Sequence, residues 1–140
     1  MAILYSVDSS NGISFMPYER QAGAGWVPGK AAGSYNAMVS QLHRSLYMAN
    51  IGADFVFPNA TAAELSRYKL LIVPCLYVAD DALLERIAEY VHGGGYVLMT
   101  FKSGFTNENS AVRWELAPGP LREAAGFTYQ EFSNLEQPLS

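Results

Sequence analysis

Short apolar runs alternate with amphipathic stretches along the chain. This alternation is typical of strands and crossover helices in a parallel sheet. Apolar residues recur at helical spacing over 35–50 and again over 83–91, so we expect helices there, the second of them capped by Asp80 or Asp81. The pattern predicts an α/β fold, with a doubly wound, mostly parallel five-stranded sheet between two helix layers and strand order 2-1-3-4-5. The expected strands are 2–7, 53–57, 69–77, 96–101 and 127–132.

Two long stretches between these elements are expected to be loops. Residues 8–33 are rich in glycine, and residues 102–118 follow a predicted buried strand. Long loops in compact domains are often functional. The second loop interleaves hydrogen-bonding side chains with Phe105 and Trp114, a composition suited to a binding surface or a subunit contact. An ordinary surface loop remains open as an alternative.

Composition limits the classes of partner. The 140 residues are 50% hydrophobic and 16% charged, which excludes a disordered chain and indicates one domain, expected over 1–133, with a tail over 134–140. A net charge of −4 argues against nucleic acid as a partner. No run approaches the roughly 20 apolar residues of a membrane span. A single cysteine fits a reducing cytoplasm.

Candidate catalytic and ligand-binding groups are few. Cys75 follows a predicted strand, but its neighbours are Pro74 and Leu76, and the two histidines, His43 and His92, lie in predicted helices. A nucleophilic thiol requires a base beside it, so a buried, inert cysteine is favoured. Residues 24–31 resemble a phosphate-binding loop but lack its first glycine and its final Ser or Thr. We therefore expect no catalytic residue, cofactor or metal ligand.

Four segments give the chain a family resemblance. They are LHRSLYMANIGADFVFP at 42–58, YKLLIVPCLY at 68–77, GGGYVLMTFKSG at 93–104 and PGPLRE at 118–123. In this order they resemble the trimerisation domain of family 42 β-galactosidases, and the likeness extends from Ile3 to Phe132. The family usually has Arg where Lys102 stands and acidic residues at the positions of Asn107 and Ser110, and Lys does not reproduce the bidentate fork of Arg.

The resemblance implies a three-layer, flavodoxin-like fold related to class I glutamine amidotransferases, without their catalytic apparatus. In the family this domain follows a barrel that carries the catalytic glutamates, and it joins three subunits. The implied partners are thus further copies of the chain, as a homotrimer, and the catalytic barrel of a parent β-galactosidase. The candidate interface residues lie in the second loop, with one in the first: Lys102, Ser103, Asn107, Glu108, Asn109, Arg113, Trp114 and Trp26.

Two other functions remain open at this point. One is an amidotransferase-like hydrolase that uses Cys75, which would require a base beside the thiol. The other is a flavodoxin-like module that binds a small ligand at the strand ends, between the loops 8–33 and 102–118, where doubly wound sheets commonly hold ligands.

Overall fold

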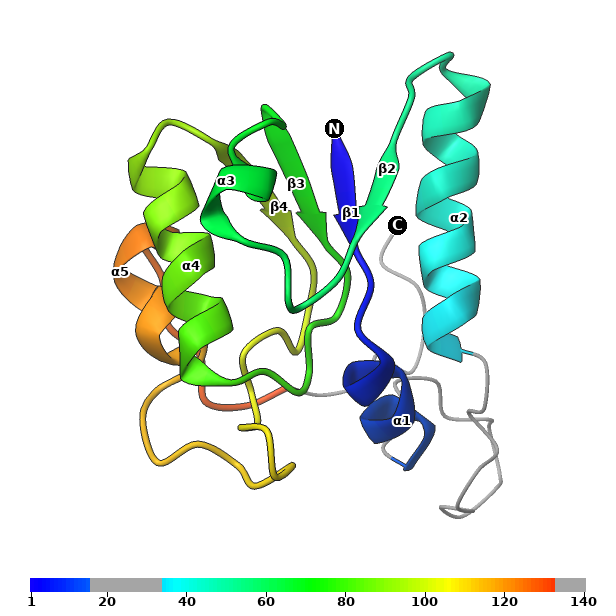
Figure 1. Cartoon of the computed structure of the whole chain (residues 1–140). Helices are drawn as coiled ribbons and strands as arrows, with labels where there is room; N and C mark the ends of the chain where they lie inside the picture. Colours follow the sequence, from blue (N-terminus) through cyan, green and yellow to red (C-terminus); the bar gives the residue numbers. More distant parts are fainter. Residues whose placement is uncertain (16–33, 133–140) are drawn as a thin grey trace.

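A four-stranded parallel sheet forms the centre of the domain (Figure 1). The computed structural model describes residues 1–15 and 34–132, so the expected tail 134–140, the glycine-rich segment 24–31 and Trp26 lie outside the described residues. The strands lie in the order β2-β1-β3-β4, and every neighbouring pair is parallel. Their bounds are β1 Ala2–Leu4, β2 Asp54–Val56, β3 Leu70–Val73 and β4 Tyr96–Met99.

Helices cover both faces of this sheet, which gives three layers (Figure 1). Helices α1 (Val7–Phe15) and α2 (Ser34–Met48) pack together on one side. Helix α3 (Ala62–Leu65), helix α4 (Asp81–His92), the 3₁₀ turn η1 (Gly119–Leu121) and helix α5 (Arg122–Ala125) lie on the other side. The expected three-layer α/β fold is confirmed.

The two cores follow from the alternation of side chains along the strands. Leu71 and Val73 of β3 point into the core that contains Leu84 and Ile87 of α4. Between them, Ile72 points to the opposite core, beside Tyr35 and Val39 of α2. Because helices cover both faces, the central strands are continuously apolar rather than alternating.

Helix α1 replaces the beginning of the expected loop. We expected a strand to Val7 and a loop from Asp8, but the first strand ends at Leu4 and Val7–Phe15 is helical. The Ser6 hydroxyl accepts a hydrogen bond from the Ser9 amide at 3.1 Å, as a helix cap does. The helix buries only Ser9 and Ile13, so its sequence carries little apolar periodicity and the prediction missed it.

The segment expected to form the fifth strand forms no ladder. Within 127–132, only Tyr129 pairs with another backbone, in one isolated antiparallel bridge to Ala117. The Tyr129 hydroxyl donates to the carbonyl of Ser103 at 2.7 Å, and its ring stacks on Phe105. The aromatic side chains that suggested a strand are thus used to pack loops together, and within residues 1–15 and 34–132 the only strand that pairs with β4 is β3.

Candidate oligomerisation surface

The loop that follows β4 is fixed to the sheet by its own backbone. Thr106 is buried, its amide and its hydroxyl both donate to the carbonyl of Tyr77, and its carbonyl accepts from the amide of Ala79. The amide of Gly104 donates to the carbonyl of Leu76 at 2.7 Å. Because these bonds join the loop to the segment after β3, the loop is a rigid part of the domain.

Asn107 shapes the tip of this loop. Its side-chain oxygen accepts from the amides of Asn109 and Ala111, each at 3.0 Å, and its own amide donates to the Ala111 carbonyl. Such side-chain to backbone bonds are typical of turns. Ser110 completes the turn with a positive φ of 59°. The turn exposes Glu108 and Asn109 to solvent.

Arg113 ties the far side of the loop to helix α4. Its guanidinium donates to the carboxylate of Asp81 and to the carbonyl of Ala79, and its side chain is almost fully enclosed. Asp81 lies in the first turn of α4, beside Asp80, whose carboxylate caps the helix through the amide of Leu83 at 2.7 Å. The cap expected at Asp80 or Asp81 is therefore confirmed at Asp80.

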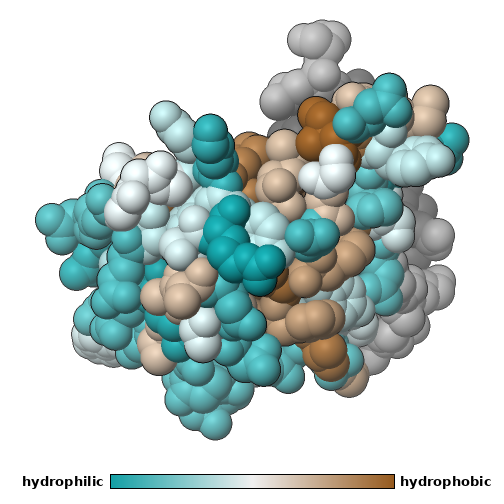
Figure 2. All heavy atoms as spheres, turned by 45° about the horizontal axis from the view of Figure 1, so that its top comes forward, coloured by the Kyte–Doolittle hydropathy of each residue, from teal (hydrophilic) through white to brown (hydrophobic). Residues whose placement is uncertain are grey.

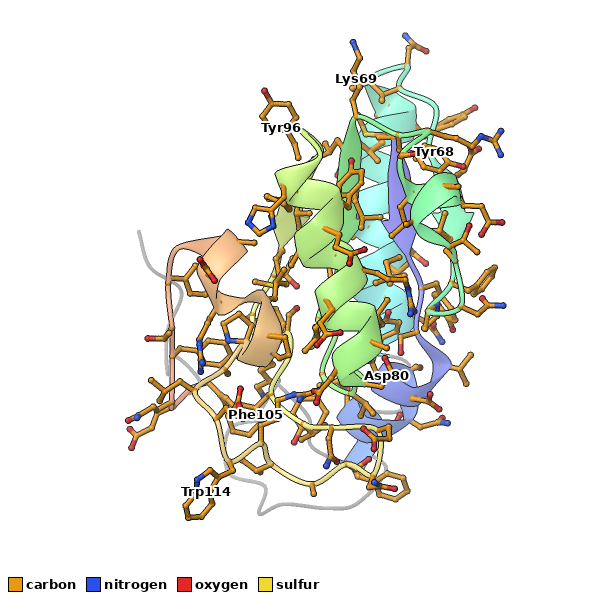
Figure 3. The ribbon with its side chains drawn as sticks, turned by 60° about the vertical axis from the view of Figure 1, so that its left-hand side comes forward. Tyr68, Lys69, Asp80, Tyr96, Phe105 and Trp114 are labelled. Carbon is orange, nitrogen blue, oxygen red and sulfur yellow. The ribbon has the colours of Figure 1, made fainter. Side chains whose placement is uncertain are left out.

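Three apolar side chains close to Arg113 in the sequence, one before it and two after it, are exposed to solvent. Val112 is 64% exposed, Leu116 is 39% exposed and Trp114 is fully exposed. We call these three residues the 112–116 apolar edge. Figure 3 shows Trp114 projecting from the body of the domain. Trp is rarely left in water on a monomer, so this edge is the best candidate for a contact surface.

The candidate residues predicted from the sequence therefore differ in exposure. Trp114, Glu108 and Asn109 are exposed, Asn107 and Arg113 are half-buried, and Lys102 and Ser103 are buried. The Ser103 hydroxyl accepts from the Leu76 amide and donates to the Thr100 carbonyl, so its role is to hold the loop. Val112 and Leu116 were not predicted as contact residues, although apolar residues in a polar loop are a signal for them.

Lys102 is a charged residue in a buried position. It has a positive φ of 60°, and its ammonium lies 4.1 Å from the centre of the Phe132 ring, a cation–π contact. Burial lowers the pKa of Lys102 from its ordinary value. Because Lys102 is buried, its ammonium cannot contact a partner protein, whereas the exposed residues of the loop can.

Cys75 does not have the surroundings of a nucleophile. The thiol is buried at the carboxyl end of β3, and burial raises its pKa to about 12, although the positive charge of Lys102 opposes the shift. His43 stacks on Phe55 of β2, which β1 separates from β3. His92 ends α4 on the way to the amino end of β4. Neither histidine provides a base at the thiol, so the hydrolase alternative is not supported.

This environment predicts that Cys75 resists alkylation. Only the thiolate reacts, and a pKa of about 12 leaves the thiol neutral at pH 8. We expect the folded chain to react with iodoacetamide at less than about a tenth of the rate of the chain unfolded in guanidinium chloride. Mass spectrometry of timed samples measures both rates, and equal rates would contradict the prediction.

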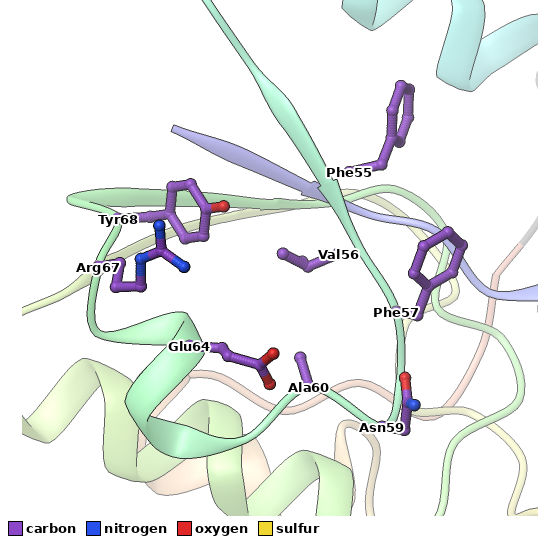
Figure 4. Close-up of a pocket in the computed structure, with 8 residues that line it drawn as sticks. All are labelled: Phe55, Val56, Phe57, Asn59, Ala60, Glu64, Arg67 and Tyr68. Carbon is purple, nitrogen blue, oxygen red and sulfur yellow. The ribbon is translucent and has the colours of Figure 1, made fainter.

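A cavity of about 320 Å³ lies beside β2 and α3 (Figure 4). Val56 points into it, whereas Phe55 and Phe57 point to the other side of β2. Two of the polar side chains around it, Glu64 and Tyr68, already form local hydrogen bonds. Glu64 accepts from the amide and hydroxyl of Thr61, which lowers the pKa of Glu64, and the Tyr68 hydroxyl donates to Asp54. None of its lining residues belongs to the loops 8–33 and 102–118, between which a small ligand was expected.

The described residues give little support to other kinds of site. Among residues 1–15 and 34–132, no group of three or more His, Cys, Asp or Glu side chains is placed to hold a metal ion. In the same ranges, no helix combines the length and the apolar character needed to cross a membrane. Trp114 is the most exposed of the large hydrophobic side chains in the described residues.

Fold and surface together define a three-layer α/β domain with a rigid, apolar loop edge. The family model of the β-galactosidase trimerisation domain matches residues 1–138, and the chain belongs to this family. The chain is 37% identical over 98 residues to the β-galactosidase BgaB of a Geobacillus strain, and 28% identical over 132 residues to BgaA of Clostridium cellulovorans. These alignments cover 70% and 94% of the chain but 14% and 18% of those relatives.

Solved structures agree with this assignment. A β-galactosidase from Rahnella sp. R3 superposes with a TM-score of 0.70 at 29% identity, over 87% of this chain and 16% of that one. A β-galactosidase structure from Bifidobacterium adolescentis gives a TM-score of 0.71 at 22% identity and shows the shared fold. It is matched over 96% of this chain and 56% of its own.

Proposed function

We propose that this chain is a non-catalytic domain that mediates homotrimer assembly of a family 42 β-galactosidase beside its catalytic barrel. The observation that carries the proposal is the fully exposed Trp114 on a loop held by buried hydrogen bonds. A rigid aromatic side chain loses little conformational entropy when a partner covers it, so it is well suited to anchor an interface. The single buried thiol fits a cytoplasmic enzyme.

The surroundings of Trp114 suit a contact between subunits. Val112 and Leu116 extend the apolar area, and the exposed Glu108 and Asn109 at the loop tip supply a polar rim. An apolar centre with a polar rim is the usual anatomy of a protein interface. Arg113 holds the loop in place before a partner arrives, which reduces the ordering cost of association.

Sedimentation velocity over a concentration series tests the assembly role. We expect the full-length protein that contains this chain to sediment as a trimer, with truncation of Trp114 shifting it toward monomers. A wild-type full-length protein that stays monomeric at all concentrations would contradict the proposal. A trimer that the truncation leaves unchanged would remove Trp114 from the interface.

The chain alone is expected to hydrolyse no galactoside. Glycoside hydrolysis needs two carboxyl groups across a sugar cleft, one of them as the general acid. Here Asp80 caps α4 and Asp81 pairs with Arg113, so neither is placed for that role. Turnover of a chromogenic galactoside by the purified 140-residue chain checks this, and a rate above that of a buffer control would contradict it.

A further inference from the structure

The cavity beside β2 and α3, which we call the β2–α3 pocket, has a wall that helix α4 holds at two points. The guanidinium of Arg86 donates to the carbonyl of Pro58 at 2.6 Å, and the hydroxyl of Tyr90 donates to the carbonyl of Tyr68 at 2.8 Å. Between these points, Leu65 is buried in the core that α4 covers. Because these contacts fix the wall, the pocket exists before a ligand arrives, and binding has little ordering cost.

A carboxylate is fixed at the edge of this pocket. The Oε2 atom of Glu64 accepts from the amide of Thr61 at 2.7 Å and from its hydroxyl at 2.9 Å. These hydrogen bonds lower the pKa of Glu64, so the group is ionised at neutral pH. Within residues 1–15 and 34–132, no donor contacts the Oε1 atom. The local bonds therefore orient the carboxylate and leave one oxygen for a ligand.

Two further polar side chains of the pocket can bond to a ligand. No ion pair among the described residues includes Arg67, and the side chains of Arg67 and Asn59 form no hydrogen bond there. In Figure 4, the guanidinium of Arg67 lies beside Tyr68 on one side of the pocket, and Asn59 lies on the opposite side. A guanidinium only donates hydrogen bonds, whereas a carboxamide both donates and accepts them. Together with Glu64, these groups place donors and acceptors around one space.

The remaining wall of the pocket is apolar. Val56 points into the space, and Ala60 lies beside Glu64 (Figure 4). Figure 2 shows apolar side chains gathered between hydrophilic flanks on the face at the amino ends of the strands, and Asp54 and Tyr68 stand at the amino ends of β2 and β3. A ligand in the pocket thus contacts apolar and polar groups together. This combination is typical of small-molecule sites.

The charges around the pocket are of both signs. Arg67 is positive, whereas Glu64 and Asp54 are negative, and the Tyr68 hydroxyl donates to Asp54 at 3.0 Å. The carboxylates repel an anion, and the guanidinium repels a cation. A neutral ligand with several hydroxyl groups meets neither repulsion, since a hydroxyl can accept from Arg67 and donate to Glu64.

We propose that the β2–α3 pocket binds a neutral sugar ring, a hexopyranose. Its hydroxyl groups pair with Glu64, Arg67 and Asn59, and its C–H groups lie against Val56 and Ala60. The volume of about 320 Å³ is at the small end of the range for ligand pockets, so the site accommodates a monosaccharide rather than a long oligosaccharide. The ionised Glu64 has no proton to give to a leaving group, so the sugar is bound and not hydrolysed.

An NMR titration of the 140-residue chain with galactose tests the proposal. Galactose is the first probe because the chain belongs to a family of β-galactosidase domains. We expect backbone amide shifts at 56–60 and 64–68, with a Kd on the order of 1–10 mM for a ligand of about 12 non-hydrogen atoms. Galacturonate, which adds a carboxylate to the same ring, should bind at least about 5-fold more weakly. Since the chain spans 14% of BgaB, a catalytic site elsewhere in such an enzyme does not contribute to the measurement.

A matched pair of substitutions tests the contact with the guanidinium. Arg67→Met removes the donors but keeps an apolar side chain, and it should raise the Kd for galactose at least about 5-fold. Arg44→Met is the control, because Arg44 is exposed on α2 and does not line the pocket. It should leave the Kd unchanged, and both variants should keep the melting temperature within about 2 °C. Trp114→Ala should also leave the Kd unchanged, so the test is independent of the assembly role.

Three results would overturn the proposal. The first is the lack of a saturable shift at these amides with galactose, glucose or mannose at about 100 mM, well above the expected Kd. The second is binding of galacturonate as tight as that of galactose, which would indicate an anion site at Arg67. The third is the same Kd for galactose in the Arg67→Met and Arg44→Met variants.

Discussion

Substitution of Gly95 by alanine is expected to lower the free energy of unfolding by about 3 kcal/mol, because no room exists for a side chain. A Cβ atom at Gly95 would lie 2.2–2.5 Å from three ring atoms of Tyr90. That ring is buried, and its hydroxyl donates to the carbonyl of Tyr68 at 2.8 Å. Moving the ring would break this bond and disturb the core beneath α4. Thermal and urea melts of the purified variant measure the loss, with a melting temperature lower by roughly 10 °C.

Gly52→Ala is the matched control for this substitution. Nothing lies within 4 Å of a Cβ atom at Gly52, so its effect should stay within about 0.5 kcal/mol. A double-mutant cycle with Tyr90→Leu isolates the steric cause, since removal of the ring should reduce the cost of alanine at position 95. If Gly95→Ala costs the same in both backgrounds, contact with the Tyr90 ring is not the cause.

Truncation of Trp114 to alanine is expected to weaken subunit association by about 2 kcal/mol or more, roughly thirtyfold in the dissociation constant. The side chain is fully exposed in the single chain, so its contacts become available to a partner without any loss to the core. The free energy of unfolding of the monomer should therefore change by less than about 0.5 kcal/mol. Sedimentation velocity measures the first quantity and thermal melts of dilute samples measure the second.

Tyr47→Ala is the control for Trp114→Ala, since it removes another exposed aromatic ring from helix α2. It should leave the dissociation constant unchanged. If both truncations weaken association equally, exposed aromatic area in general is responsible. If neither does, the 112–116 apolar edge is not the interface.

Local patterns predicted much of the architecture. The stripe of apolar residues in α4 and the acidic cap at Asp80 are properties of adjacent residues, so periodicity and capping rules found them. The apolar run 69–77 likewise predicted a strand, and the expected order 2-1-3-4-5 placed it inside the sheet, as β3 is. Helix α1 was not predicted from the sequence, because it has a single buried apolar residue, Ile13, and its cap comes from Ser6.

The candidate surface was predicted only in outline. The sequence indicated the loop after β4, but both Lys102 and Trp114 were predicted to be interface residues in it. Their separation depends on contacts between distant segments, since Lys102 is enclosed beside Phe132 and Arg113 is bound to Asp81. Side-chain exposure in an irregular loop has no period along the chain, so pattern analysis could not assign it.

The sequence by itself determined the class of fold, the positions of four strands and of helices α2 and α4, and the family, because these depend on local periodicity and on motifs that stand in the chain as written. The tertiary structure decided which side chains face water. It placed Tyr129 against Phe105, and in the described part of the chain β4 pairs with β3 alone. The physical reason is that burial and strand pairing depend on contacts between residues tens of positions apart. Patterns among neighbouring residues in one sequence do not reveal these contacts.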